Sequence, residues 1–206
     1  MRSASIDSPA ADAVELKPRL ATAEAFAPFG WVRALHTSST LSAASFSLTP
    51  ALLCVSLPQL VEATEDGVPF GAQDAALELS GGTPRLYLMR LPPRGLQFSS
   101  FARHSKVTQC LAATGDTPWY IAVAPPPPLD AQGEVEVQES EVQLFEVRPP
   151  TVVCLRRNCW HSGPYFTDGP RLFYNLELVD TNQNDGNRAS TSRPFRMQLD
   201  GAAQHT

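Results

Sequence analysis

Short apolar segments, broken repeatedly by proline and glycine, are the feature that most limits how this chain can fold. The 206 residues include 19 prolines and 12 glycines, and no stretch carries the apolar spacing of a long amphipathic helix. Where a pattern is clear, its period is two, which places alternate side chains on opposite faces of a β-strand. Many short strands at close intervals predict an all-β protein, either an antiparallel β-barrel or a double-sheet jelly roll with minor helix.

Six segments have the length and composition of strands. They are Leu52–Leu57, Arg85–Leu91, Trp119–Ala124, Val135–Val147, Thr151–Leu155 and Leu172–Val179. Both faces of Arg85–Leu91 are largely apolar, so we expect a central strand there. One short helical turn is expected within Leu16–Phe29, where Thr22 precedes Phe26 and Pro28 limits the helix.

The domain boundaries follow from where patterning begins and ends. Residues 1–14 contain no apolar core of a secretory signal, and we interpret them as a disordered leader. One domain is expected over residues 15–181. After Asp180 the chain loses its periodicity and its apolar content, so residues 182–206 are predicted to be a polar, mobile tail.

Charge and cysteine content narrow the range of partners and compartments. The formal net charge is −5 and no Lys/Arg block occurs, which argues against nucleic acid and anionic membrane surfaces as partners. No apolar run reaches the roughly 20 residues that span a bilayer. The four cysteines form no CxxC pair, which favours reduced thiols and a cytoplasmic location, with an organelle left open. The expected partner is therefore a small molecule.

Two histidine-bearing stretches predict where such a molecule would bind. Of the four histidines, two lie near the chain ends, which leaves His104 in Arg103–Gly115 and His161 in Asn158–Phe166. We expect the two stretches to form the halves of one site, although a single histidine at a strand end is more often structural. Strict alternation from His104 would turn Gln109 to the other face, so Gln109 requires a bend or a bulge to point inward.

The spacing of these residues resembles the two-motif layout of the cupin superfamily. His104, Lys106, Gln109 and Gly115 follow the order of the first motif, and His161 follows a strand about fifty residues later. Metal-binding cupins have a second His where this chain has Lys106, and a Glu near the position of Gln109. Lysine and glutamine are poor ligands for a transition metal, so a bound divalent cation is an option and not a requirement.

Within the cupins, the ureidoglycolate lyase family, also called ureidoglycolate hydrolase, is a closer match, over roughly residues 15 to 181. The pieces that carry the likeness are Phe26, Phe29-Gly30, Arg90 before Pro92, Arg103-His104, Thr108-Gln109, Leu111–Gly115, Trp160-His161, Pro164 and the strand that ends at Asp180. The longer motifs look like those of the plant and algal branch. Three positions depart from the family pattern, because Ala102, Ser105 and Ser162 replace a common Glu, Pro and His.

The resemblance implies a carbon–nitrogen lyase of purine and allantoin catabolism that splits ureidoglycolate into glyoxylate and urea. The implied residues are His104, His161 and Gln109 for catalysis, Arg90, Arg103, Lys106, Tyr174 and Asn175 for substrate binding, and His104 and His161 for a divalent transition metal if one is bound. Two imidazoles suit an acid and a base near neutral pH. The family also implies a homodimer.

Strand alternation predicts which arginine would bind the substrate carboxylate. Arg90 shares a strand face with Leu86 and Leu88, where a guanidinium would gain from a bound anion. Arg103 alternates away from His104 and ranks second.

Two other functions stay open at this point. A cupin-fold binding or regulatory protein without turnover is favoured by the departures at Ala102 and Ser162. A metal-dependent cupin enzyme of other specificity is disfavoured by the missing second His of the first motif.

Overall fold

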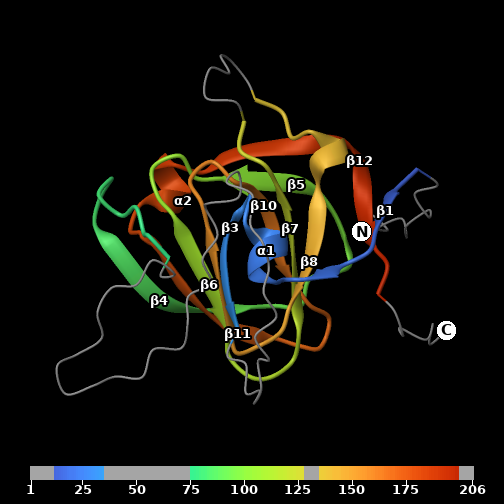
Figure 1. Cartoon of the computed structure of the whole chain (residues 1–206), viewed down its shortest axis with the longest axis horizontal. Coiled ribbons are helices and arrows are strands. Elements are labelled where there is room, and N and C mark those ends of the chain that lie inside the picture. The colour runs from blue at the N-terminus through green and yellow to red at the C-terminus, as the bar shows by residue number, and fades with distance from the viewer. Residues whose placement is uncertain (1–11, 35–74, 128–134, 200–206) are drawn as a thin grey trace, which may run out of the picture.

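Two packed β-sheets make up the fold, which is described here from a computed structural model that covers residues 12–34, 75–127 and 135–199 (Figure 1). The seven-stranded sheet has the order β1 (Val14–Leu16), β12 (Asn187–Met197), β5 (Gln97–Arg103), β10 (Trp160–Tyr165), β7 (Trp119–Ala124), β8 (Gln143–Val147) and β2 (Arg19–Leu20). The five-stranded sheet has the order β3 (Gly30–Ala34), β9 (Thr151–Leu155), β6 (Gln109–Ala113), β11 (Arg171–Leu178) and β4 (Pro84–Leu91).

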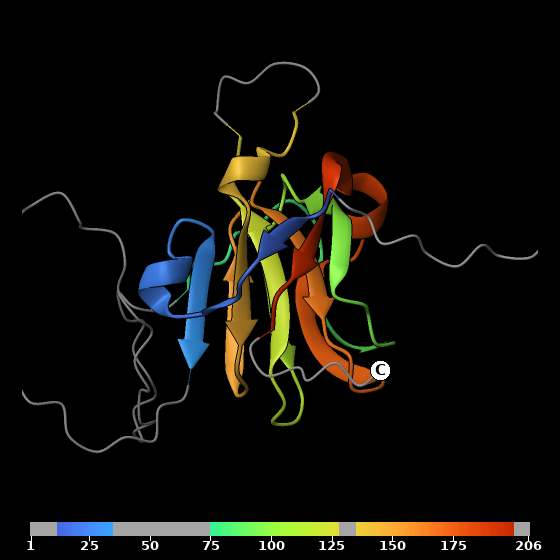
Figure 2. The ribbon, with the colours of Figure 1, turned by 90° about the vertical axis from the view of Figure 1, so that its right-hand side faces the viewer.

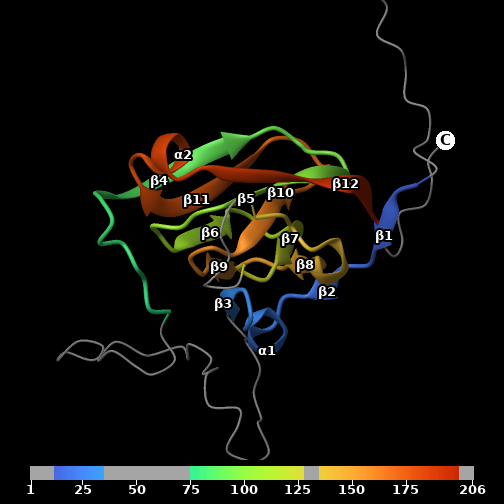
Figure 3. The ribbon, with the colours of Figure 1, turned by 90° about the horizontal axis from the view of Figure 1, so that it is seen from above.

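The strand pairs are antiparallel except at two edges of the seven-stranded sheet. There β1 pairs with β12, and β2 pairs with β8, in parallel. Helix is confined, in the described part of the chain, to α1 (Ala23–Phe26), α2 (Thr181–Asn184) and the single 3₁₀ turn η1 (Glu139–Glu141). Figures 2 and 3 show α1 and α2 on opposite sides of the strand framework. The prediction of an all-β fold with minor helix is confirmed.

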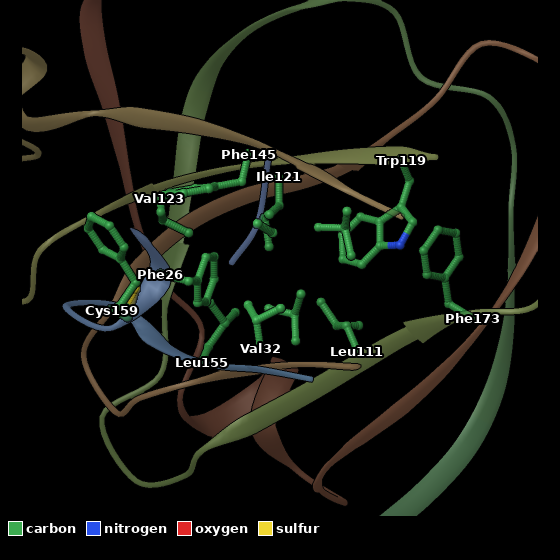
Figure 4. Close-up of a cluster of buried hydrophobic side chains, with 14 of the residues drawn as sticks. Phe26, Val32, Leu111, Trp119, Ile121, Val123, Phe145, Leu155, Cys159 and Phe173 are labelled. Atoms are coloured by element: carbon green, nitrogen blue, oxygen red, sulfur yellow. The ribbon is translucent and has the colours of Figure 1, made fainter. Parts of the chain in front are cut away.

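The main apolar core lies between the sheets and takes side chains from both. Figure 4 shows Trp119 and Ile121 of β7 and Phe145 of β8 facing Leu111 of β6 and Phe173 of β11. Alternation on each strand places these residues on its inner face. The core therefore holds the two sheets together.

The short helix α1 closes one side of this core, as its sequence predicted. The side chain of Thr22 accepts a hydrogen bond from the backbone N–H of Ala25 and so caps the first turn. Phe26 is fully buried, and its ring meets that of Phe145 edge to face with centroids 5.1 Å apart. The turn therefore serves to insert one aromatic side chain.

Strand β4 lies at an edge of its sheet, so the prediction of a central strand was wrong. It pairs with β11 on one side and has no partner on the other among the described residues. Tyr87 and Met89 face inward, whereas Leu86 and Leu88 are 68% and 49% exposed. Apolar residues on both faces reflect an apolar outer surface of the sheet.

The prediction of a mobile tail over residues 182–206 was also wrong for most of its length. Residues 187–197 form β12, which pairs with both β1 and β5. Its segment is rich in Arg and Ser, so its order comes from ladder hydrogen bonds and from Phe195 and Met197, which are buried. The last seven residues lie outside the described part of the chain.

The other predicted elements divide into three groups. Trp119–Ala124 and Thr151–Leu155 are the strands β7 and β9, and β11 matches Leu172–Val179 within one residue at each end. Val135–Val147 forms a strand only from Gln143 onward. Leu52–Leu57 lies outside the described residues, as does most of the predicted leader, whose last residue, Val14, begins β1.

Within the segments that the structure describes, no helix has the length and the apolar character needed to cross a bilayer.

Candidate active site

The two interior histidines meet, as the sequence predicted. His104 follows the last residue of β5, and His161 lies in β10, the neighbouring strand, where it pairs with Ala102. Their ring centroids are 5.1 Å apart, and both side chains are largely buried while lining one cavity. Two histidines that are 57 residues apart in sequence therefore form one site.

Backbone carbonyls fix the orientation of both imidazoles. The Nδ1 atom of His104 lies 2.9 Å from the carbonyl oxygen of Asp185, and that of His161 lies 3.2 Å from the carbonyl oxygen of Cys159. A carbonyl oxygen only accepts hydrogen bonds, so each Nδ1 carries the proton. The Nε2 atom of each ring is thereby left for a ligand in the cavity.

The surroundings of His161 keep this imidazole neutral. Burial is the main cause that lowers the pKa of His161 to about 3, and the charge of His104 acts in the same direction. The charge of Arg188 lowers the pKa further, while the hydrogen bond to the backbone of Cys159 opposes the shift. At neutral pH His161 therefore presents a lone pair.

This depressed pKa has a consequence for stability. In the unfolded chain, His161 binds a proton as the pH falls below its ordinary pKa of 6.5. In the folded chain it stays neutral until the pH approaches about 3. Acidification through this window should lower the free energy of unfolding by about 1 kcal/mol per pH unit from this group. Guanidinium denaturation at several pH values should show a shallower pH dependence in His161→Asn, and equal slopes would contradict the assigned pKa.

A cavity of about 310 Å³ lies between the two sheets next to the histidines. Its walls come from β4, β5, β6, β10, β11 and β12. Gln109 lines it because β5 ends at Arg103, and residues 104–108 then carry the chain to the five-stranded sheet, where Gln109 begins β6. The bend that Gln109 required is present.

The five-stranded sheet contributes a row of amide groups to this cavity. Gln109 donates through Nε2 to Glu177 at 3.0 Å, and Asn175 donates through Nδ2 to the Tyr87 hydroxyl at 2.8 Å. Tyr87 in turn donates to Glu177 at 2.8 Å. The remaining atoms, Oε1 of Gln109 and Oδ1 of Asn175, are buried without a hydrogen-bond partner among the described residues. Both residues line the cavity, so these two covered acceptors lie next to it, and a small shift of either amide would present its oxygen to an N–H group of a ligand.

Two arginines that the sequence analysis did not select line the same cavity. Arg188 and His161 pair with the same residue, Ala102, from its two sides, so the three lie in one row across the sheet. Arg188 forms no ion pair or hydrogen bond with any residue in the described segments. Arg94 donates to the carbonyl of Gly163 at 3.2 Å. Both guanidinium groups lie on exposed residues at the rim of the cavity.

Four of the predicted substrate-binding residues do not line the cavity. They are Arg90, Arg103, Lys106 and Tyr174. Arg90 and Tyr174 lie on the exposed outer face of the five-stranded sheet, because the inner face of β4 carries Tyr87 and Met89 instead. The expectation that Arg90 faces the site was therefore wrong.

Arg103 and Lys106 take part in contacts around the histidine turn. Arg103 donates to Oδ1 of Asn158 at 2.7 Å and lies over the Trp160 ring at 5.1 Å. The exposed Lys106 donates through Nζ to the carbonyl of Asn184 at 3.2 Å. These contacts turn both cations away from the cavity.

Asp185 holds the turn that carries His104 and was missed because it lies in the predicted tail. Its carboxylate accepts hydrogen bonds from the backbone N–H and hydroxyl of Ser105 and from the backbone N–H of Lys106, at 2.7 to 2.8 Å. These bonds lower the pKa of Asp185 against the opposing effect of burial. The carboxylate and carbonyl of one residue thus fix the turn and the imidazole.

Comparison with known proteins identifies the family. No curated protein sequence matches the chain. A family model, described as ureidoglycolate lyase, matches residues 13–198. This range runs from the residue before β1 to the residue after β12, and it includes both histidines and the cavity-lining arginines. The chain therefore belongs to the ureidoglycolate lyase family, the enzymes that split ureidoglycolate into glyoxylate and urea.

Proposed function

We propose that the cavity between the two sheets is where this lyase splits ureidoglycolate, with His104 and His161 as the proton-transfer pair. The observation that carries the proposal is the combination of two free imidazole Nε2 atoms, two unpartnered amide oxygens and two guanidinium groups around one cavity of about 310 Å³. The substrate carries a hydroxyl group, a ureido group and a carboxylate. Each has a complementary group in the cavity.

The reaction transfers one proton from oxygen to nitrogen. The hydroxyl proton leaves, the carbon–oxygen bond becomes a carbonyl, the carbon–nitrogen bond breaks, and the departing urea nitrogen takes up a proton. We assign His161 as the base that accepts the hydroxyl proton. Burial lowers its pKa, and the negative charge of a bound substrate carboxylate would raise that pKa again. Because a charge on His104 disfavours a second charge on His161, the pair is suited to carry a single positive charge. We assign His104 as the acid that protonates urea.

Recognition of the substrate is assigned to residues on opposite walls. Arg188, with Arg94 as the second guanidinium that lines the cavity, would bind the carboxylate through charge-assisted hydrogen bonds. The Oε1 atom of Gln109 and the Oδ1 atom of Asn175 would accept hydrogen bonds from the ureido N–H groups. These contacts would align the carbon–nitrogen bond next to the two imidazoles.

The histidine pair also fits a divalent transition metal. Metal-ligating imidazoles commonly donate their other ring nitrogen to a carbonyl, as both histidines do here. His104 and His161 would hold the ion, which would polarise the substrate hydroxyl as a Lewis acid. No group of three or more His, Cys, Asp or Glu side chains in the described segments could add further ligands.

The proposal is tested by assaying the purified protein on ureidoglycolate with and without a chelator. Glyoxylate formation in both samples supports proton transfer by the imidazoles themselves. Loss of activity with the chelator, restored by added divalent metal, supports the metal-bound form of the same site. Absence of glyoxylate in every sample, including the sample with added metal, would contradict the proposed function. It would favour the alternative of a cupin-fold binding protein without turnover.

We also propose that the chain forms a homodimer through the outer face of the five-stranded sheet. Exposed apolar side chains gather there on β4, β9 and β11, namely Leu86, Leu88, Val152, Leu172 and Tyr174. An apolar face of this kind can pair with its own copy about a two-fold axis.

Sedimentation tests the dimer. Leu86→Glu should convert a dimer into a monomer of 22.3 kDa, because the charge would be buried in the interface. The matched control is Leu20→Glu, which alters an exposed leucine on β2 in the other sheet. A monomeric unaltered protein at micromolar concentration would contradict the proposal.

Three broader assignments accompany these roles. The two-sheet fold with one histidine from each of two motifs supports a place in the cupin superfamily. The substrate supports a place in purine and allantoin catabolism. The cysteines are scattered without a CxxC pair, and Cys154 and Cys159 are buried, which supports a reducing compartment such as the cytoplasm.

A further inference from the structure

Glu177 is a buried carboxylate for which the proton-transfer chemistry has no direct use. It lies on the inner face of β11 with 1% of its surface exposed, and it does not line the cavity. It forms no ion pair with a cation in the described segments. Three donors converge on it instead, because Oε1 accepts from Tyr87 and Asn182, and Oε2 accepts from Gln109.

The register of the five-stranded sheet brings these groups together. β11 lies between β6 and β4, and Asn175 pairs directly with Leu111 on one side and with Tyr87 on the other. Glu177 lies two residues further along β11, on the same face as Asn175. The result is a polar row on an otherwise apolar inner surface, next to the cavity.

The carboxylate dictates how both amides are turned. An ionised carboxylate only accepts hydrogen bonds, so Gln109 must direct its NH₂ group to Glu177 and its oxygen elsewhere. The Tyr87 hydroxyl uses its single proton on Glu177, so it can only accept from Asn175, whose oxygen is also turned away. Burial raises the pKa of Tyr87, with the hydrogen bond to Glu177 as the second cause, which keeps that proton in place.

We infer that Glu177 is a positioning residue that makes this wall of the cavity an acceptor of N–H groups and thereby selects the ureido end of the substrate. The inference rests on the proposed function, which it deepens by stating how the wall obtains its polarity. Two unpartnered oxygens at the wall are suited to a urea group, which offers N–H donors. A ligand that presents only acceptors there would face repulsion.

Glu177→Gln tests the inference, because the substitution keeps the shape and changes the hydrogen-bonding pattern. The glutamine amide has one oxygen, which would take the place of Oε1 of Glu177, because Tyr87 and Asn182 both donate to that atom. Its NH₂ group then faces Gln109, whose amide must rotate and present N–H to the cavity. The wall would offer the wrong polarity to urea.

The informative measurements are KM, kcat and the inhibition constants of the two products. For Glu177→Gln we expect KM for ureidoglycolate and the inhibition constant of urea to rise by about tenfold or more, as expected for a mismatched buried polar contact. The inhibition constant of glyoxylate should change less than about twofold, because the carboxylate site is on another wall, and kcat should fall less than KM rises.

Two further variants separate positioning from a general loss of structure. Tyr87→Phe keeps Glu177 and Gln109 in contact but frees the Asn175 amide, so urea inhibition should weaken by a smaller factor while glyoxylate inhibition stays constant. Glu146→Gln is the matched control, since Glu146 is a strand glutamate on β8 whose side chain, within the described segments, forms an ion pair with Arg148, and it should change neither constant.

The outcomes distinguish this inference from the proposed function. Weaker inhibition by urea alone supports it, even if Glu177→Gln lowers the melting temperature. Equal weakening of inhibition by urea and by glyoxylate, or unchanged constants in both Glu177→Gln and Tyr87→Phe, would overturn it while leaving the lyase activity in place. An unaltered protein that neither turns over ureidoglycolate nor binds urea would overturn both. If Glu177→Gln fails to fold, Tyr87→Phe alone decides, with unchanged urea inhibition counting against the inference.

Discussion

His161→Asn is expected to lower kcat for ureidoglycolate by about 10²- to 10⁴-fold, the usual contribution of a positioned acid or base. Asparagine retains an N–H group at the position of Nδ1, so the hydrogen bond to the carbonyl of Cys159 can persist. It removes Nε2, the atom assigned to accept the hydroxyl proton. The loss should therefore appear in kcat with little change in KM.

The same substitution at His104 provides the comparison. His104→Asn should also reduce kcat by at least about a hundredfold, because the urea nitrogen would depart without its proton. Tyr174→Phe, which alters an exposed residue on the outer face of β11, is the control and should retain full activity. Either histidine variant with kcat within threefold of the unaltered protein would refute the assignment of that histidine to proton transfer.

Arg188→Met is expected to raise KM for ureidoglycolate by about 30- to 150-fold, corresponding to about 2 to 3 kcal/mol for lost hydrogen bonds to a carboxylate. Arg188 lies in the row with His161 and forms no ion pair with the described residues, so its charge is available to the substrate. Methionine keeps much of the side-chain length without the charge. The inhibition constant of glyoxylate should rise in parallel.

The control for Arg188 is Arg90→Met on the outer face of β4, where loss of the charge should leave KM unchanged. Arg94→Met should have a smaller effect than Arg188→Met, since Arg94 already donates to the carbonyl of Gly163. A normal KM in Arg188→Met together with a raised KM in Arg90→Met would restore the original choice from strand alternation and contradict the cavity assignment.

The histidine pair could be predicted from the sequence because few alternatives existed. Only His104 and His161 lie in the interior of the chain, and each adjoins a strand. Neighbouring strands of a sheet bring the residues at their ends close together. The two histidine motifs therefore predicted a single site. The turn between β5 and β6 also had to exist if Gln109 was to face inward.

The direction in which each strand faces could not be predicted where both faces are apolar. On β4, alternation places Arg90 with Leu86 and Leu88, but it does not say whether that set is inside. The structure places it outside, and the same ambiguity put Tyr174 in the predicted site. A signal was available on β11, where Asn175 and Glu177 alternate in an apolar strand and mark the face that meets a polar cavity.

Arg188 and Asp185 were missed for a different reason. Their segment has little apolar periodicity, because β12 is stabilised by pairing with β5 and β1 rather than by a continuous buried face. Single-strand patterns do not report such pairing. Residues at the C-terminal end of the chain therefore complete a site whose histidines lie much earlier.

The most direct test of the central claim is to measure the products formed from ureidoglycolate by the purified, unaltered protein. Glyoxylate, urea and ammonia are quantified in the same reaction and compared with a sample without enzyme. The account predicts equal amounts of glyoxylate and urea, formed well above the uncatalysed rate and without ammonia, because only the carbon–nitrogen bond to the hydroxyl-bearing carbon is broken. Release of ammonia, or no product above the uncatalysed rate, would contradict it.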